Sequence, residues 1–317
     1  MAITWLTPSA IAMGNTVNTW IDMDVSASVP AGATGVVLHV RGAASSVRTF
    51  GVRKKGSTDD RTGLIQSNYS NAWTIVGVDN DRVFQITRNA NDTYLYLVGY
   101  TTDETSIFEN SLEKVLGSAA TWTDIDISAD TGSNKAIGVI VEIKNTTSSS
   151  GNWGIRKKGS TDEYYYLIIE NGITWAFIGV DDNEVLELKV ADVGIKAYVI
   201  GYFTKDVVFN TNGTDISLTQ TGGYYDLPAL PSGATGGFIQ VCGPTQTRSY
   251  AIRKNGTTQE FYGYVTRMAW AAVECDEDGL LEGRISNTAG RFYLSGYTLG
   301  SADPSADPTG IFFAAII

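Results

Sequence analysis

The sequence has very little histidine, cysteine and proline. Its 317 residues include one histidine, two cysteines and seven prolines. The lone His39 has no repeated serine or cysteine partner, so it cannot supply a catalytic triad, and the histidines and cysteines are too few for a zinc site. No glycine-rich phosphate loop precedes a helical pattern. We therefore expect a protein that is not an enzyme and that has neither a metal site nor a cofactor.

Positive charge and long apolar runs are also scarce. Lys and Arg number 23 against 34 Asp and Glu, which gives a net charge of −11. This balance argues against a nucleic-acid partner, because phosphate binding needs a basic surface. No apolar run approaches the roughly 18–20 residues of a membrane helix. The first 20 residues lack the basic and apolar regions of a signal peptide, so we expect a protein made and folded in a cytoplasm, with no membrane partner.

What the sequence does contain is typical of β-strands. Hydrophobic residues make up 43% and aromatic residues 11%, enough for packed cores. The apolar runs are short and rich in Val, Ile, Tyr and Trp, and Gly, Thr, Ser and Asn separate them, as in strands joined by tight turns. Only residues 110–118 ("NSLEKVLGS") show helical spacing, and only for about two turns.

One basic phrase occurs three times: "GVRKKGSTDD" at 51–60, "GIRKKGSTDE" at 154–163 and "AIRKNGTTQE" at 251–260. A tryptophan follows each copy, an aspartate follows each tryptophan by six residues, and a Gly-Tyr pair comes 20 residues after each aspartate. The tryptophans and aspartates are Trp73, Trp175, Trp270, Asp79, Asp181 and Asp276. A period of about 100 residues is too long for a solenoid repeat, so each copy should be a whole domain.

These patterns predict an all-β protein of three tandem homologous antiparallel β-sandwich domains of jelly-roll type, with seven or eight strands each. We expect the domains at 1–104, 105–205 and 206–317, the last with a C-terminal apolar strand. Aligned on the other copies, Cys242 and Cys275 fall on different strand faces, which favours two free thiols over a disulfide.

Four short aromatic strands mark the boundaries of three domains. They contain Thr4-Trp5, Ile107-Phe108, Val208-Phe209 and the final "GIFFAAII" at 310–317. One of the four is therefore spare, and an unpaired apolar strand is an aggregation risk unless it pairs with another strand. It either joins a sheet edge of its own chain or adds to a sheet of another subunit. The candidate attachment strands are Ile3–Leu6 and the C-terminal residues Ile311, Phe312, Phe313, Ile316 and Ile317.

The basic phrase has two interpretations. As structure it is a hairpin tip, in which the shared glycine and the Asn255-Gly256 pair indicate a type I′ turn, and the next Ser or Thr begins the return strand. As a site it is a basic patch for an anionic partner. The residues of that patch are Arg53, Lys54, Lys55, Arg156, Lys157, Lys158, Arg253 and Lys254.

Two further repeated features are open to a structural and a binding interpretation. The acidic turns at Asp79, Asp181 and Asp276 favour Asx-turns over calcium loops, because the further oxygen ligands of a calcium site are missing. The strand tryptophans, which include Trp20 and Trp122, favour packing over stacking on sugar rings.

The string "GVRKKGSTDD…VGVDNDRVFQI…YLYLVGY" resembles β-sandwich repeats in virion proteins of tailed bacteriophages and related viruses. The resemblance covers nearly the whole chain through its three copies and carries over no single site residue. It implies a structural virion protein, a capsid decoration or tail-associated subunit, whose partners are other virion subunits or copies of itself. The alternative is a multivalent, lectin-like protein that binds cell-surface glycans.

Overall fold

The computed structural model describes residues 1–42, 48–65, 71–116, 119–243, 248–265 and 267–300. It is almost entirely β-structure, as the sequence predicts, with one short helix, α1 (Ser128–Thr131). Domain 1 denotes β1 (Ile3–Ala10), β2 (Ile21–Asp24), β3 (Gly35–Gly42), β4 (Arg48–Lys54), β5 (Gly63–Ile65), β6 (Asn71–Gly77), β7 (Val83–Arg88) and β8 (Thr93–Thr101). Domain 2 denotes β9 (Thr105–Lys114), β10 (Thr123–Asp126), β11 (Gly138–Asn145), β12 (Gly151–Lys157), β13 (Tyr166–Ile168), β14 (Ile173–Gly179), β15 (Val185–Val190) and β16 (Ile195–Phe203). Domain 3 denotes β17 (Val207–Asp215), β18 (Tyr225–Asp226), β19 (Ala234–Cys242), β20 (Arg248–Lys254), β21 (Gly263–Val265), β22 (Met268–Glu274), β23 (Leu281–Ile285) and β24 (Arg291–Leu299).

The three domains share one jelly-roll topology. In domain 1 the sheets run β1-β8-β3-β6 and β2-β7-β4-β5, and both are antiparallel. Domains 2 and 3 repeat this order with their own eight strands. Each sandwich is closed by alternating inward side chains, such as Leu38 and Phe84, which are both fully buried. The domain limits 1–104, 105–205 and 206–317 remain our proposal for where the repeats divide.

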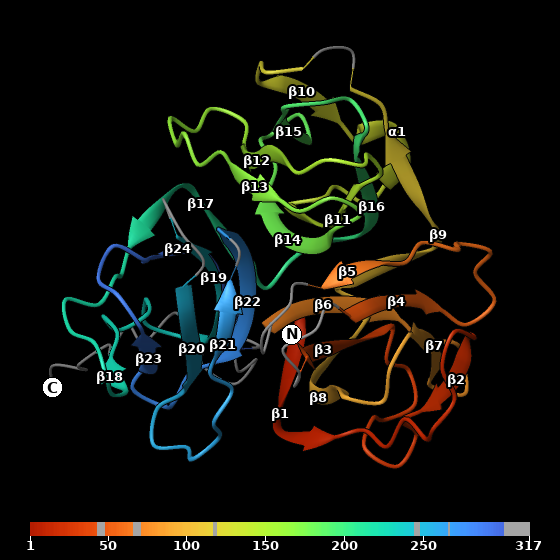
Figure 1. Ribbon diagram of the computed structural model, residues 1–317, viewed down its shortest axis with the longest axis horizontal. Coiled ribbons are helices and arrows are strands. Elements are labelled where there is room, and N and C mark those ends of the chain that lie inside the picture. Colours follow the sequence, from red (N-terminus) through yellow and green to blue (C-terminus); the bar gives the residue numbers. More distant parts are fainter. Residues whose placement is uncertain (43–47, 66–70, 117–118, 244–247, 266, 301–317) are drawn as a thin grey trace, which may run out of the picture.

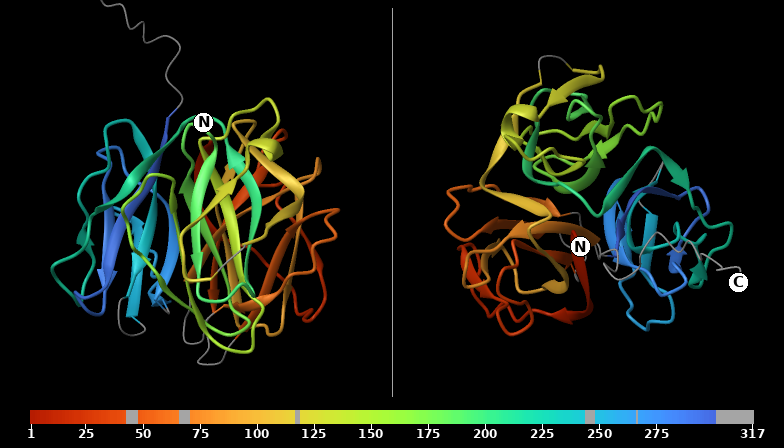
Figure 2. Two further views of the ribbon diagram at one scale, coloured as in Figure 1. Left: turned by 90° about the horizontal axis from the view of Figure 1, so that it is seen from above. Right: turned by 180° about the vertical axis from the view of Figure 1, so that it is seen from behind.

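The domains are arranged as a triangle around a common axis (Figure 1). The edge strands β6, β14 and β22 contact one another at its centre. One hydrophobic cluster passes through all three domains, with Ile75, Phe177 and Phe238 fully buried in it. The strands run roughly along this axis, and the N-terminus lies at one end of the molecule along the axis (Figure 2). The molecule is therefore one packed unit.

Each boundary strand completes the sheet of the domain that follows it. β1 pairs with β8, β9 with β16, and β17 with β24. Ile3–Leu6 is thus used inside domain 1, which corrects its prediction as a free attachment strand. The helical candidate at 110–118 is not a helix over residues 110–114, which belong to β9. Its pairing with the long strand β16 outweighs a weak local preference. The C-terminal candidates Ile311, Phe312, Phe313, Ile316 and Ile317 lie outside the described residues.

Candidate functional site at the domain junctions

The repeated basic phrase forms a turn, but of a different type from the one predicted. The amides of Ser57 and Ser160 each donate to a carbonyl three residues earlier, and Gly56 and Gly159 have φ of 91° and 87°. Only the second central residue has positive φ, which makes the turn type II. The predicted type I′ turn is wrong for this reason, and Asn255 does not have positive φ either.

The return strand also begins later than predicted. β5 starts at Gly63, which pairs with Phe50, so residues 57–62 form a loop between the turn and β5. The equivalent loops precede β13 in domain 2 and β21 in domain 3. Each loop leaves its own sandwich and lies against the next domain, which explains why the strand cannot return directly.

The arginine of each phrase holds this loop in place. Arg156 Nε donates to Glu187 at 2.8 Å, and its Nη1 donates to the Asp162 carbonyl at 2.8 Å. Its guanidinium lies 4.0 Å from the Trp122 ring centroid, and the Trp122 indole donates to Glu163 at 2.9 Å. Arg53 beneath Trp20 and Arg253 beneath Tyr224 repeat the arrangement. These arginines are therefore committed to contacts within their own domain.

The lysines of the phrase have more varied partners. Lys55 pairs with Asp22, and Lys158 pairs with Asp124 at 2.6 Å, although both lysine side chains stay 37% exposed. Lys157 Nζ donates to the Phe209 carbonyl of domain 3 at 3.4 Å, and Lys254 pairs with Glu274 at 2.8 Å. Binding of an anionic partner at these tips stays a prediction.

The loops of domains 1 and 2 are bound to the next domain by an asparagine. Asn110 of β9 accepts hydrogen bonds from the Ser57 hydroxyl at 2.9 Å and the Thr58 amide at 2.8 Å. Asn212 of β17 accepts the same two bonds from Ser160 and Thr161, at 2.9 and 2.8 Å. Neither asparagine was predicted, because aligning the boundary strands on Ile107-Phe108 and Val208-Phe209 places Asn110 opposite Thr211. Their equivalence follows only from the strand register, in which Ile107 and Phe209 occupy the same position.

A neighbouring aspartate adds a second bond at each of these junctions. Asp59 accepts from the Ser111 amide at 2.9 Å, and Asp162 accepts from the Gly213 amide at 2.7 Å. Burial opposes the charge of Asp59, but hydrogen bonds from Arg61 and Ser111 hold its pKa below the ordinary value. The aspartates of the repeated phrase thus serve the contact between domains.

Each basic phrase contains one arginine at the same position. The residue eight positions after that arginine inserts its side chain into the next domain. Arg61 donates to Glu142 at 2.5 Å and lies 4.1 Å from the Tyr198 ring centroid. The equivalent contacts pair Tyr164 with Tyr293, beside Gln240, and Phe261 with Tyr96, beside His39. The receiving positions are the fully or almost fully buried strand positions of His39, Glu142 and Gln240.

Burial sets the charge state of these receiving groups. It raises the pKa of the Glu142 carboxyl, and the Arg61 guanidinium opposes that rise. It lowers the pKa of His39 to about 3, although a 2.9 Å hydrogen bond to Asn71 favours the protonated ring. His39 is therefore neutral, and it stacks on Trp73 with ring centroids 4.2 Å apart.

Near the axis, aromatic pairs join the domains in the same cyclic sense. Phe50 contacts Trp175, Trp153 contacts Trp270, and Tyr250 contacts Trp73, with ring centroids 6.5, 5.6 and 6.2 Å apart. Because the three strand tryptophans are at most 3% exposed, the prediction that they serve packing is confirmed.

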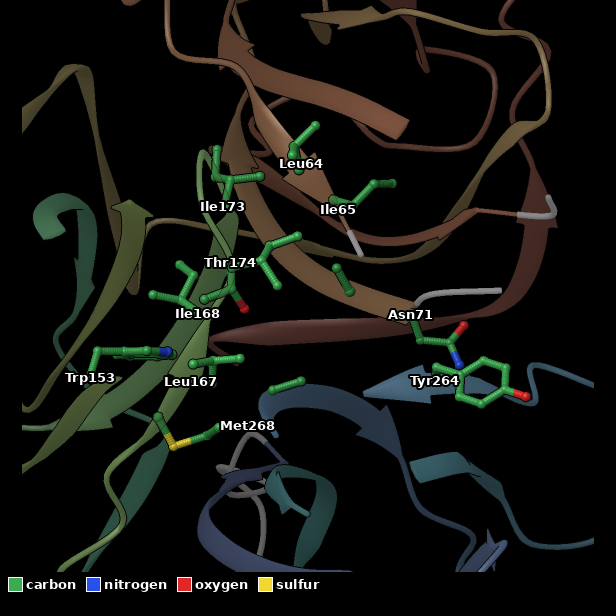
Figure 3. Close-up of a pocket in the computed structure, with 14 residues that line it drawn as sticks. Leu64, Ile65, Asn71, Trp153, Leu167, Ile168, Ile173, Thr174, Tyr264 and Met268 are labelled. Atoms are coloured by element: carbon green, nitrogen blue, oxygen red, sulfur yellow. The ribbon is translucent and has the colours of Figure 1, made fainter. Parts of the chain in front are cut away.

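Side chains from all three domains also converge on a small axial cavity (Figure 3). Leu64, Ile168 and Met268 are among its lining residues, and its volume is about 50 Å³. This volume is far below the several hundred Å³ of an ordinary ligand pocket. The cavity is a packing gap where three strand ends meet.

The acidic turns are Asx-turns, as predicted. Asp79 accepts from the amides of Asp81 and Val83, and Asp181 and Asp276 accept from the equivalent amides. Both cysteines are free and buried. Within the described ranges there is no group of three or more His, Cys, Asp and Glu side chains placed to hold a metal ion. Among the same residues no helix is long and apolar enough to cross a bilayer.

Comparison with known proteins gave only weak structural similarities. No family model and no curated protein matches the chain. A structure described as the triple jelly roll fold and turret assembly of an archaeal virus is 13% identical, with a TM-score of 0.24 over 92% of this chain and 84% of that chain. A second, from Sulfolobus Turreted Icosahedral Virus, is 15% identical, with a TM-score of 0.24 over 92% and 86%. A third, from the lipid-containing bacteriophage PM2, is 8% identical, with a TM-score of 0.16 over 95% and 88%.

Proposed function

We propose that this protein is a non-enzymatic structural subunit of a virion, a capsid decoration or tail-associated protein that attaches through protein–protein contacts. The observation that supports this most is the convergence of the N-terminus, both joins between domains and the last described residues at one end of the triangle. A rigid block whose first residue, joins and last described residues lie together on one face is suited to be fixed to a larger assembly by that face.

The convergence rests on direct contacts. The Met1 ammonium lies 3.3 Å from Glu104 and 3.0 Å from Asp206, which belong to the two joins. The Thr204 amide donates to the Glu104 carbonyl at 2.9 Å, and the Leu299 amide donates to the Asp206 carbonyl at 2.9 Å. The last described residues of domain 3 therefore lie beside the N-terminus.

In this proposal the attachment strand is the C-terminal apolar segment Ile311–Ile317. Its three counterparts, β1, β9 and β17, each complete a sheet of this chain, so the fourth copy is left for a sheet of another subunit, in the virion or in a second copy. The partly exposed Lys55 and Lys158, which pair with Asp22 and Asp124, offer a second contact, to an acidic partner surface.

The test compares the full chain with a variant that lacks residues 311–317. Both should fold alike, because every described strand pairs within residues 3–299. Electron microscopy of the native particle, together with cosedimentation of each protein with particles, should show attachment of the full chain and its loss in the truncated one. Unchanged attachment after truncation would sink the attachment-strand proposal, and absence of the protein from particles would sink the virion role.

A further inference from the structure

The third junction, between domains 3 and 1, lacks three of the contacts that close the other two. β1 is one residue shorter than β9 and β17 between its paired positions, and in place of Asn110 and Asn212 it has Thr7 and Pro8. Among the described residues, neither side chain accepts a hydrogen bond from the loop of domain 3. Asp59 and Asp162 correspond to Gln259, and no hydrogen bond links Gln259 to β1 among the described residues. The loop of domain 3 is thus not bound to β1 in the way the other loops are bound to β9 and β17.

A glycine that allows close contact is also replaced. A Cβ on Gly77 would lie 2.7 Å from Ile107, and one on Gly179 would lie 2.5 Å from Phe209, so the boundary strands press directly on these glycines. The third copy has Glu274 instead, which pairs with Lys254. The contact with the boundary strand is therefore closed at the first two junctions, which have glycine at this site, and open at the third, which has glutamate.

The result is a cavity beside these positions at the third junction. Its volume is about 270 Å³, whereas the equivalent spaces at the other two junctions measure about 20 and 10 Å³. The floor is buried and includes Trp73, Ile252 and Phe261, while the rim includes the exposed Thr7 and the partly exposed Pro8 and Gln259. The cavity is therefore a blind hollow with an opening on the surface.

The lining combines aromatic rings with paired charges. Trp5, Trp73 and Phe261 line it, together with the aliphatic Val98 and Val273. The cations at its edge are neutralised within the chain, since Lys254 pairs with Glu274 at 2.8 Å and Arg253 with Glu282 at 2.7 Å. No unpaired charge among the lining residues calls for an ion, so the fitting ligand is neutral.

The size and polarity of the hollow narrow the class of ligand further. An apolar cavity of about 150 Å³ holds benzene, and pockets for drug-sized ligands begin near 300 Å³. This hollow therefore takes one or two rings. The Gln259 amide, the Thr257 hydroxyl and the Lys254–Glu274 pair stand beside the aromatic rings. A pyranose ring matches this lining, because it has an apolar C–H face and a polar edge of hydroxyl groups.

We propose that the hollow between domains 3 and 1 binds a neutral saccharide ring, either free or as a unit of a glycan. Trp5 and Phe261 contact the apolar face, the buried Trp73 closes the floor beneath it, and Gln259 and Glu274 hydrogen-bond its hydroxyls. A larger hollow of about 820 Å³ beside Thr34 and Lys135 has no aromatic ring in its lining and does not suit such a ligand. The inference rests on the hollow alone and is independent of the virion role.

The test titrates the full chain with neutral methyl glycosides, followed by saturation-transfer NMR, and with an immobilised array of neutral glycans. The matched variant restores the closed pattern with Pro8→Asn, Gln259→Asp and Glu274→Gly together. An Asn183→Ala variant, at an exposed position of domain 2 outside the hollow, serves as the control, and thermal unfolding verifies that each variant is folded. Binding by the full chain that falls at least tenfold in the triple variant and persists in Asn183→Ala supports the proposal.

Other results overturn it. These are the absence of binding to every glycoside and glycan, and equal binding by the triple variant. Should the triple variant not fold, Gln259→Ala alone must weaken binding severalfold, and unchanged binding counts against the site. A chain ending at Gly300 tests whether residues 301–317 occupy the hollow in place of a saccharide. Saccharide binding that is seen only after this truncation would assign the hollow to that segment. Binding by glycosides as well as glycans identifies the ring itself as the ligand, whereas binding by glycans alone identifies a unit within a longer chain.

Discussion

Arg61 of domain 1 donates a hydrogen bond to Glu142 of domain 2 across 2.5 Å, and only 2% of the Glu142 side chain is exposed. At the next two junctions the corresponding side chains make ring contacts, Tyr164 with Tyr293 and Phe261 with His39. The three junctions therefore share one geometry but use an ion pair at the first and aromatic contacts at the other two. Each can be perturbed separately, which makes the account testable junction by junction.

Arg61→Ala should destabilise the protein strongly. It leaves Glu142 buried without its cation, a loss that typically costs about 3–5 kcal/mol. Urea unfolding at neutral pH measures the free energy of unfolding. Lys55→Ala is the matched control, since its ion pair with Asp22 is partly exposed and should contribute less than about 1 kcal/mol. An Arg61→Ala variant as stable as the Lys55→Ala control would contradict the buried pair.

His39 should make the protein less stable as the solution is acidified. Its pKa is about 3 in the folded protein, against 6.5 for an ordinary histidine, so the unfolded state binds the extra proton between these values. Stability is therefore full above pH 6.5 and falls by up to about 1.4 kcal/mol per pH unit below it. His39→Gln, which copies the residue of domain 3, should remove this fall between pH 6.5 and 5.

The chain makes this measurement clean because it has a single histidine. The imidazole signals in NMR should show no titration between pH 7 and 5 while the protein is folded. A histidine that titrates near 6.5 in the folded state would mean that the ring is exposed and would contradict the Phe261–His39 contact.

Asn110→Ala and Asn212→Ala should each lower stability by about 1–2 kcal/mol, because each removes the acceptor for the amide and hydroxyl of a docked loop. The exposed Asn183 is a suitable control, and Asn183→Ala should change stability by less than about 0.5 kcal/mol. Hydrogen exchange at the Thr58 and Thr161 amides provides a local check. Exchange that is as fast in the wild type as in the variants would show that the bonds do not form.

Gly159→Ala should destabilise by about 1 kcal/mol or more, because φ is 87° at this position and alanine avoids that region. Gly159→Asn should cost less, since asparagine tolerates positive φ better. Thermal unfolding of the two variants gives the comparison. Equal stability of Gly159→Ala and the wild type would argue against the type II turn.

Much of the fold could be predicted from the sequence because repetition marks it. The tryptophans at 73, 175 and 270 recur at fixed spacing, and packing was the right prediction for them. The turn glycine was also correctly singled out. Its turn type was wrong because Asn-Gly is a local signal, whereas the loop after Gly256 is directed by contacts outside its own sandwich.

The junctions could not be predicted from the repeat. A triplicated sequence shows which residues correspond, but not which copy contacts which. Arg61, Tyr164 and Phe261 occupy one position with three different chemistries, so no pattern marks them. His39 has Glu142 and Gln240 as its counterparts, and such a set indicates only a generic polar strand position. That the position is buried follows from the neighbouring domain that covers it.

The central claim is that the basic phrases and their loops lock three sandwiches into one unit. Urea unfolding of the intact chain, followed by both far-ultraviolet circular dichroism and tryptophan fluorescence, tests it most directly. The account predicts one cooperative transition at which the two signals coincide. One hydrophobic cluster passes through all three domains, and a second joins the interior of domain 1 to Ile173 and Trp175 of domain 2. Two or three separate transitions, each with the amplitude of a single domain, would contradict it.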